Sequence, residues 1–287
     1  MEYEAFFRFK QRPFSLTPDP KFYFRSRSHG RVFDALSSAV SRRESVMLIA
    51  GDLGVGKTTL CRTLIETQER KARAALLGNA LLSPDDLLRL MLHDLGAVSP
   101  EDARQGKLLA LTREQLMDVF NRFIGELKAS THGALMIIDE AHSLPAATTE
   151  QIVELASLDA NRDRVLQFLL AGQPAVGGAP MLPAIVDQKI NVRTRLLPLE
   201  RDECEKYVAH RMAIAGGHVE FIPAAIEMIY GLSGGVPRLI NLLCERALQE
   251  AAATNTRRVE PSAIDSAASA LDIVRLRPRR FRWYGTR

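Results

Sequence analysis

Cysteine is scarce in this sequence, with residues only at Cys61, Cys204 and Cys244. An odd number of widely separated cysteines fits neither a disulfide framework nor a zinc site, and it favours a reducing compartment. The longest apolar runs, such as 134–138, fall far short of the ~18–20 residues that span a bilayer. Residues 1–12 lack the apolar region of a secretory signal. These absences predict a globular cytoplasmic protein.

Composition and length agree with that expectation. The chain has 287 residues, of which 46% are hydrophobic and 25% charged, as in ordinary soluble proteins with one large or two small domains. The formal net charge is +4, but the last thirteen positions hold six arginines and no acid. Residues 1–274 therefore carry 32 bases against 34 acids, and the basic character belongs to the tail.

The pattern of apolar runs divides the chain. Three prolines within residues 1–30 predict an extended segment, followed by a helix over 32–43, so residues 1–44 are expected to pack on a larger body. Residues 45–199 alternate buried strands with helices, which indicates an α/β fold: a three-layer αβα domain with a parallel sheet. The expected strands are 46–50, 72–77, 134–138, 165–171 and 191–197. The expected helices between them are 58–70, 84–94, 113–130 and 148–158.

Strand signals vanish from residue 200 onward. Helices are expected over 201–215, 223–230, 237–253 and 261–271, with Gly231 ending the second. Residues 200–273 are therefore predicted to form a small all-helical lid domain, and residues 274–287 a basic, aromatic tail.

A glycine-rich loop follows the first expected strand and precedes a helix, which is the context that the motif G-x-x-x-x-G-K-[ST] requires. In such loops the glycines let successive backbone N–H groups point at phosphate oxygens. Lys57 is expected at the β- and γ-phosphates of ATP, and the Thr58 hydroxyl at Mg²⁺. The expected nucleotide-binding residues of the loop are Gly51, Asp52, Leu53, Gly54, Val55, Gly56, Lys57, Thr58 and Thr59.

Two adjacent carboxylates end the strand over 134–138, where a Walker B element is expected. Asp139 is predicted to hold Mg²⁺ and Glu140 to polarise the attacking water, which indicates a hydrolase. Two solvated acids at the start of a loop are the alternative. The letters DEAH also match a helicase box, but other helicase motifs are not recognisable, and His142 is interpreted as an ordinary loop histidine.

Two further polar residues are candidates for sensing the nucleotide. Gln173 follows the strand over 165–171 and is predicted to act as a sensor-1 group, with an amide that merely caps the strand as the alternative. Arg238 follows Pro237 at the start of a lid helix, and both are expected near the nucleotide, Arg238 as a sensor-2 group. A solvated arginine at a helix start is the alternative.

Five separated blocks together resemble the ExeA/GspA-type AAA+ ATPases of general secretion, whose relatives serve pilus and exopolysaccharide export. The blocks are YEAFF with PFSLTPDP, GDLGVGKTT, IIDEAH, LLAGQP and GLSGGVPRLINLLCERAL. The resemblance covers roughly residues 1–270. It implies an AAA+ fold, ATP hydrolysis coupled to homo-oligomerisation in a ring or filament, and partners in envelope assembly.

The sequence departs from the family pattern at several positions. Asp52 and His142 stand where relatives usually carry Glu and Gln, and residues 176–180 are glycine-rich where relatives continue a helix. In the block before the last strand, Lys189 replaces an arginine that acts in trans on a neighbour's nucleotide. Either Lys189 or Arg193 is therefore the candidate intersubunit finger, and a lysine lacks the planar fork of arginine.

The tail has several interpretations. Many relatives continue into a membrane span and a peptidoglycan-binding domain, so Arg275–Arg287 resembles the positive flank of a span or an anchor to anionic lipid at the inner face of the membrane. Arginines interleaved with aromatics also suit nucleic acid. A solubilising, disordered tail is the third alternative.

These observations favour an ATPase that uses ATP and Mg²⁺ to drive assembly of an envelope secretion or polysaccharide-export system. A DNA-binding ATPase of the transposition-regulator type, forming ATP-dependent rings or filaments, is the alternative. A nucleotide switch that does not hydrolyse ATP is a third hypothesis, favoured by the lysine at position 189.

Overall fold

The computed structural model describes residues 3–68, 72–78, 81–130, 132–158, 164–174 and 181–273. The chain divides into two compact units. The sheet unit comprises His29–Leu53 and Lys57–Leu196, and the helical unit comprises Met1–Ser28, Gly54–Gly56 and Leu197–Arg287. The division expected from sequence, at residues 44, 199 and 273, stays a prediction. The basic tail and residues 176–180 lie outside the described residues.

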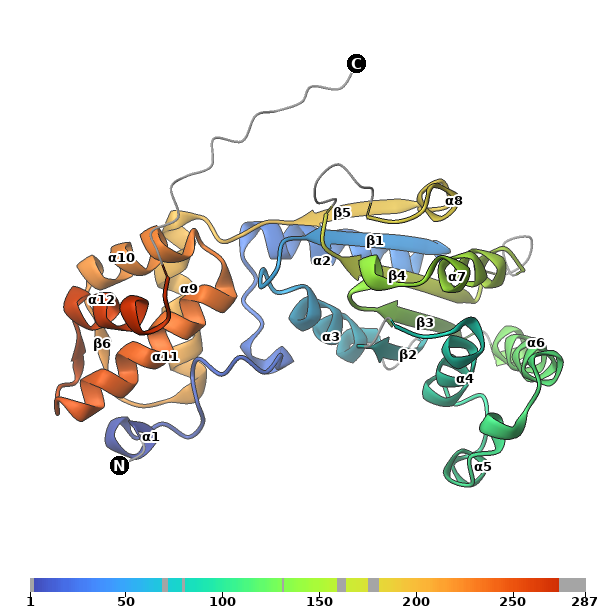
Figure 1. Ribbon diagram of the computed structural model, residues 1–287, viewed down its shortest axis with the longest axis horizontal. Coiled ribbons are helices and arrows are strands. Elements are labelled where there is room, and N and C mark those ends of the chain that lie inside the picture. Colours follow the sequence, from blue (N-terminus) through green and yellow to red (C-terminus); the bar gives the residue numbers. More distant parts are fainter. Residues whose placement is uncertain are drawn as a thin grey trace, which may run out of the picture. The chain divides into compact units, whose positions relative to one another are not determined.

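The sheet unit is built on five parallel strands (Figure 1). The strands are β1 (Val46–Gly51), β2 (Ala72–Leu77), β3 (Gly133–Ile138), β4 (Leu166–Gly172) and β5 (Val192–Leu196). Their order in the sheet is β2-β3-β4-β1-β5. The predicted parallel sheet is confirmed, and β4 lies between the strands that carry the two sequence motifs.

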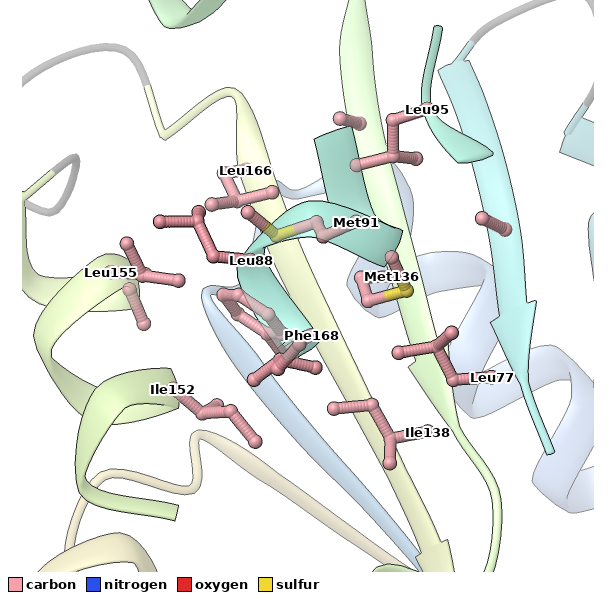
Figure 2. Packing of buried hydrophobic residues seen from close by; sticks show 14 of the residues in the cluster. Leu77, Leu88, Met91, Leu95, Met136, Ile138, Ile152, Leu155, Leu166 and Phe168 are labelled. Atoms are coloured by element: carbon pink, nitrogen blue, oxygen red, sulfur yellow. The ribbon is translucent and has the colours of Figure 1, made fainter. Parts of the chain in front are cut away.

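Helices connect the strands and bury both faces of the sheet. They are α2 (Arg27–Ser41), α3 (Lys57–Gln68), α4 (Pro84–Asp94), α5 (Pro100–Arg104), α6 (Arg113–Ser130), α7 (Ala146–Leu158) and α8 (Ala184–Asp187). On one face, Leu88 and Met91 of α4 pack with Met136 and Phe168 of the sheet (Figure 2). The alternate residues of the strands, such as Ile137, are buried as well. Burial on both faces explains why the three central strands of the sheet, β1, β3 and β4, read as nearly continuous apolar runs.

Local capping explains why α4 begins where the sequence predicts. The Ser83 hydroxyl accepts a hydrogen bond from the Asp86 N–H at 3.2 Å, and Pro84 occupies the first turn. The same arrangement of Ser99 and Pro100 begins α5, which was not predicted because it is only five residues long.

The helical unit contains α9 (Arg201–Ala215), α10 (Pro223–Ser233), α11 (Pro237–Ala253) and α12 (Pro261–Ala270), with α1 (Tyr3–Phe7) near the N-terminus. The predicted helical C-terminal region is confirmed. Two details were wrong. The helix α10 runs through Gly231 and ends at Ser233, with Gly234 as its C-cap, and two-residue strands β6 (Glu220–Phe221) and β7 (Arg258–Val259) pair in parallel. A pair this short leaves no periodic signal in sequence.

The N-terminal segment belongs to this helical unit. Buried Arg211 of α9 donates hydrogen bonds to the carbonyls of Pro13 and Ser15, at 2.5 and 3.1 Å, and lies over the ring of Phe22. These main-chain oxygens accept the hydrogen bonds that the buried guanidinium must donate. They are available because the prolines keep this segment from forming a helix. None of the helices described here is both long and apolar enough to cross a membrane.

The turn between α10 and α11 gives a testable prediction for stability. Gly235 has φ +77°, and a β-carbon there would lie 2.0 Å from the Leu199 carbonyl oxygen. We expect Gly235→Ala to lower the free energy of unfolding of the helical unit by about 3 kcal/mol, through strain and overpacking. Urea unfolding followed by circular dichroism measures this loss.

Gly231→Ala is the matched control. Gly231 lies inside α10, and a β-carbon there meets no atom within 4 Å. Replacing a helical glycine by alanine should raise stability by about 0.5–1 kcal/mol. Equal effects of the two substitutions would contradict this account of the turn.

Candidate functional site

The residues singled out in the sheet unit follow three neighbouring strands. The glycine-rich loop follows β1, Asp139 follows β3, and Gln173 follows β4, which lies between the other two. The Asp139 N–H donates to the Leu77 carbonyl oxygen at 2.9 Å, which extends the pairing of β2 with β3 by one residue. Parallel strands end at one edge of the sheet, where open α/β folds bind their ligands.

Lys57 of the loop is a buried cation. It begins α3, is 5% exposed, and its Nζ donates to the carbonyl oxygens of Gly51 and Asp52 at 2.9 and 3.2 Å. No carboxylate among the described residues forms an ion pair with it. A buried charge is costly unless an opposite charge compensates it. The site therefore suits an anion such as a phosphate group.

The glycines of the loop adopt conformations that other residues avoid. Gly54 has φ +79° and Gly56 φ +105°. Left-handed residues within a tight loop make the concave arrangement of amides that receives phosphates. Val55 between them is buried, whereas Asp52 and Leu53 are exposed, and Thr59 lies in the first turn of α3.

Asp139 and Thr58 form a pair of oxygen groups. The Thr58 hydroxyl donates to the Asp139 carboxylate, which is 5% exposed and also accepts the Glu140 N–H at 2.9 Å. Hydroxyl and carboxylate oxygens are the ligands that a hard cation such as Mg²⁺ takes in proteins. The donor set therefore fits the metal expected from sequence.

Cys61 lies one turn beyond Thr58 in the same helix. Burial and the charge of Asp139 raise the pKa of this thiol, and Lys57 lowers it to a smaller extent. The raised pKa keeps the Cys61 thiol protonated at neutral pH. Because only the thiolate reacts as a nucleophile or binds a metal, Cys61 is chemically inert there.

Glu140 and His142 stand on the loop after β3. Glu140 has a left-handed backbone (φ +53°) and a side chain that is 41% exposed. The His142 Nε2 lies 3.5 Å from its carboxylate, and the Gln173 N–H donates to the His142 Nδ1 at 3.4 Å. The interpretation of His142 as an ordinary loop histidine did not anticipate these two contacts. The place of His142 in the DEAH block was the signal, but its contact with β4 depends on the order of the strands.

Arg238 and Pro237 begin α11 in the helical unit, which also includes Gly54–Gly56. Within that unit the Arg238 N–H donates to the Gly54 carbonyl oxygen at 3.1 Å, and a β-carbon on Gly54 would lie 2.7 Å from the Arg238 Cβ. Gly54 therefore allows a close approach that no other residue would permit. Arg238 itself is exposed.

The two candidate finger residues differ in their partners. Arg193 of β5 is tied to Asp187, with one guanidinium nitrogen 2.6 Å from the carboxylate and another donating to the carbonyl oxygen of the same residue. Lys189 is exposed and forms no ion pair with any described residue.

The comparisons with known proteins agree with this geometry. Residues 40–177 match the AAA domain family. General secretion pathway protein A of Aeromonas hydrophila is 31% identical over 276 residues, which cover 95% of this chain and 49% of that protein. This chain therefore spans about half the length of that relative.

Three solved structures with the same fold are 14–20% identical to this chain. The RuvB Holliday junction branch migration motor of Thermotoga maritima aligns over 86% of this chain and 69% of its own, with a TM-score of 0.58. The ORC2 protein of Aeropyrum pernix aligns over 91% and 72%, with a TM-score of 0.68, and Cdc6p of Pyrobaculum aerophilum over 90% and 70%, with a TM-score of 0.69. Residues 40–177 therefore match an AAA domain, the chain has the fold of these solved structures, and its sequence is similar to that of general secretion pathway protein A.

Proposed function

We propose that this chain binds ATP with Mg²⁺, hydrolyses it as a homo-oligomer, and thereby drives assembly of an envelope secretion or polysaccharide-export system. The observation that carries the proposal is the pair of buried, oppositely charged residues Lys57, in the loop that follows β1, and Asp139, directly after β3, with only β4 between those two strands. The similarity to general secretion pathway protein A supports the envelope part.

Each residue of the site has a proposed role. Lys57 neutralises charge on the β- and γ-phosphates, and Thr58 with Asp139 holds the metal. Bound Mg²⁺ supplies further neutralisation of phosphate charge. Glu140 orients the attacking water and takes up its proton, Gln173 contacts the γ-phosphate, and Arg238 senses the nucleotide from the helical unit. Catalysis is then chiefly electrostatic and positional.

Replacing Glu140 tests the hydrolytic role. Glu140→Gln should bind ATP with unchanged affinity but lower turnover by ~10²-fold or more, since an amide cannot accept the proton of the water. Phosphate release under saturating Mg·ATP measures turnover, and calorimetry measures affinity. Glu126→Gln, on an exposed position of α6, is the matched control and should behave as wild type. Wild-type turnover in Glu140→Gln would reject the assignment.

We infer that Lys189, not Arg193, is the cation that reaches a neighbouring subunit's nucleotide. Arg193 is held by Asp187 of its own subunit, and freeing it would break two charge-assisted contacts. Lys189 is exposed and forms no ion pair with another described residue. A lysine in this role would stabilise the developing phosphate charge less than an arginine fork.

Mixing two variants with lowered turnover tests the finger in trans. Lys189→Ala should lower turnover about tenfold, below the 10³–10⁵ range of arginine fingers, with ATP affinity retained. Adding Glu140→Gln protein, whose Lys189 is intact, should restore part of the phosphate release of Lys189→Ala protein. No restoration, or loss of turnover in Arg193→Ala alone, would contradict the assignment.

The attachment to anionic membrane or nucleic acid depends on Arg275–Arg287, which lie outside the described part of the chain. This attachment stays a prediction, as do the DNA-binding alternative and the cytoplasmic location. An ATP-dependent shift of duplex DNA that weakens steeply with salt would favour the DNA-binding alternative.

A further inference from the structure

His142 joins two residues that belong to different strand ends. It lies in a short 3-10 turn (Ala141–Ser143) after β3, and its side chain is 28% exposed. The Nδ1 atom lies 3.4 Å from the main-chain nitrogen of Gln173, and the Nε2 atom 3.5 Å from Oε2 of Glu140. One ring therefore bridges the end of β4 and the carboxylate that follows β3.

The main chain determines which ring nitrogen carries the proton in the neutral form. The Gln173 N–H can only donate, so the Nδ1 that faces it must be the acceptor. The proton of the neutral ring is then on Nε2, the atom that faces the Glu140 carboxylate. In this tautomer His142 donates toward Glu140 while β4 fixes its orientation.

Gly172 makes room for this ring. A β-carbon at position 172 would lie 3.2 Å from the His142 Nδ1 and 3.3 Å from the His142 main-chain nitrogen. The same β-carbon would lie 2.4 Å from the terminal carbon of Met181, a flexible side chain. The last residue of β4 thus lacks a side chain where the histidine approaches.

We propose that His142 is a positioning residue that acts through Glu140: its ring, held by the main chain after β4, keeps the Glu140 carboxylate in the orientation used for hydrolysis. The inference rests on the proposed hydrolytic function, and it adds a residue that the sequence motifs left without a role. Glu140 itself has a left-handed backbone and a side chain that is 41% exposed. Without the contact to His142, its carboxylate would be free to rotate. A contact from a ring anchored on a neighbouring strand removes that freedom.

Two amide substitutions distinguish a positioning role of His142 from a purely structural one. In His142→Gln the amide nitrogen takes the place of Nε2 and keeps the contact with Glu140. In His142→Asn the shorter amide takes the place of Nδ1 and keeps only the contact with the Gln173 N–H. Both variants are polar at a partly exposed turn, so both are expected to fold, which thermal melting checks.

The expected result is a difference in kcat alone. His142→Asn should lower kcat about tenfold with KM for Mg·ATP within twofold, whereas His142→Gln should keep kcat within about threefold of wild type. A purely structural role predicts the reverse order, because only Asn keeps the link between the turn and β4. Wild-type kcat in His142→Asn, or equal loss in both variants, would overturn the proposal.

A double-mutant comparison distinguishes failure of the proposal about His142 from failure of the proposed hydrolytic role of Glu140. In the Glu140→Gln background, His142→Asn should cause no further loss, since the two residues act as one unit. A further loss of equal size would show that His142 does not act through Glu140 and would overturn the proposal. If Glu140→Gln alone turned over at the wild-type rate, the proposed hydrolytic role of Glu140 would fail, and the inference about His142 with it.

Discussion

The interaction on which the site depends is the burial of the Lys57 ammonium against the carbonyl oxygens of its own loop. Two carbonyl dipoles orient the ammonium but leave its charge uncompensated. Asp139, equally buried at a nearby strand end, carries the opposite uncompensated charge and is bonded to the Thr58 hydroxyl. Keeping such charges inside a folded protein is costly, and a phosphate with a metal ion would compensate both.

The sheet supplies the rigidity that this arrangement needs. Strands buried on both faces are held by packing such as that of Phe168 against α4 and α7, which fixes where each strand ends. Because β4 lies between β1 and β3, residues more than 80 positions apart in sequence, Thr58 and Asp139, meet at one edge. At the same edge, His142 in the turn after β3 accepts a hydrogen bond from the main chain after β4.

Much of this could be predicted because the signals are local. The run 72–77 and the Ser83-Pro84 cap define β2 and the start of α4 at the observed residues, and the spacing of the glycine-rich loop identifies the P-loop. Contacts that depend on strand order could not be predicted. The approach of Gln173 to His142, 31 residues apart, requires β4 beside β3, and neither residue type marks it. The Asp187–Arg193 pair joins residues only six positions apart, but it depends on how the chain turns from α8 into β5, which the sequence does not indicate.

Calorimetric titration of wild-type protein and Lys57→Ala with Mg·ATP tests the central claim most directly. We expect wild type to bind one nucleotide per chain, and Lys57→Ala to lose at least about 3 kcal/mol of binding free energy, as when one partner of a buried charge pair is removed. Equal heats and affinities for the two proteins, or no heat with wild type, would show that the buried ammonium does not bind the triphosphate.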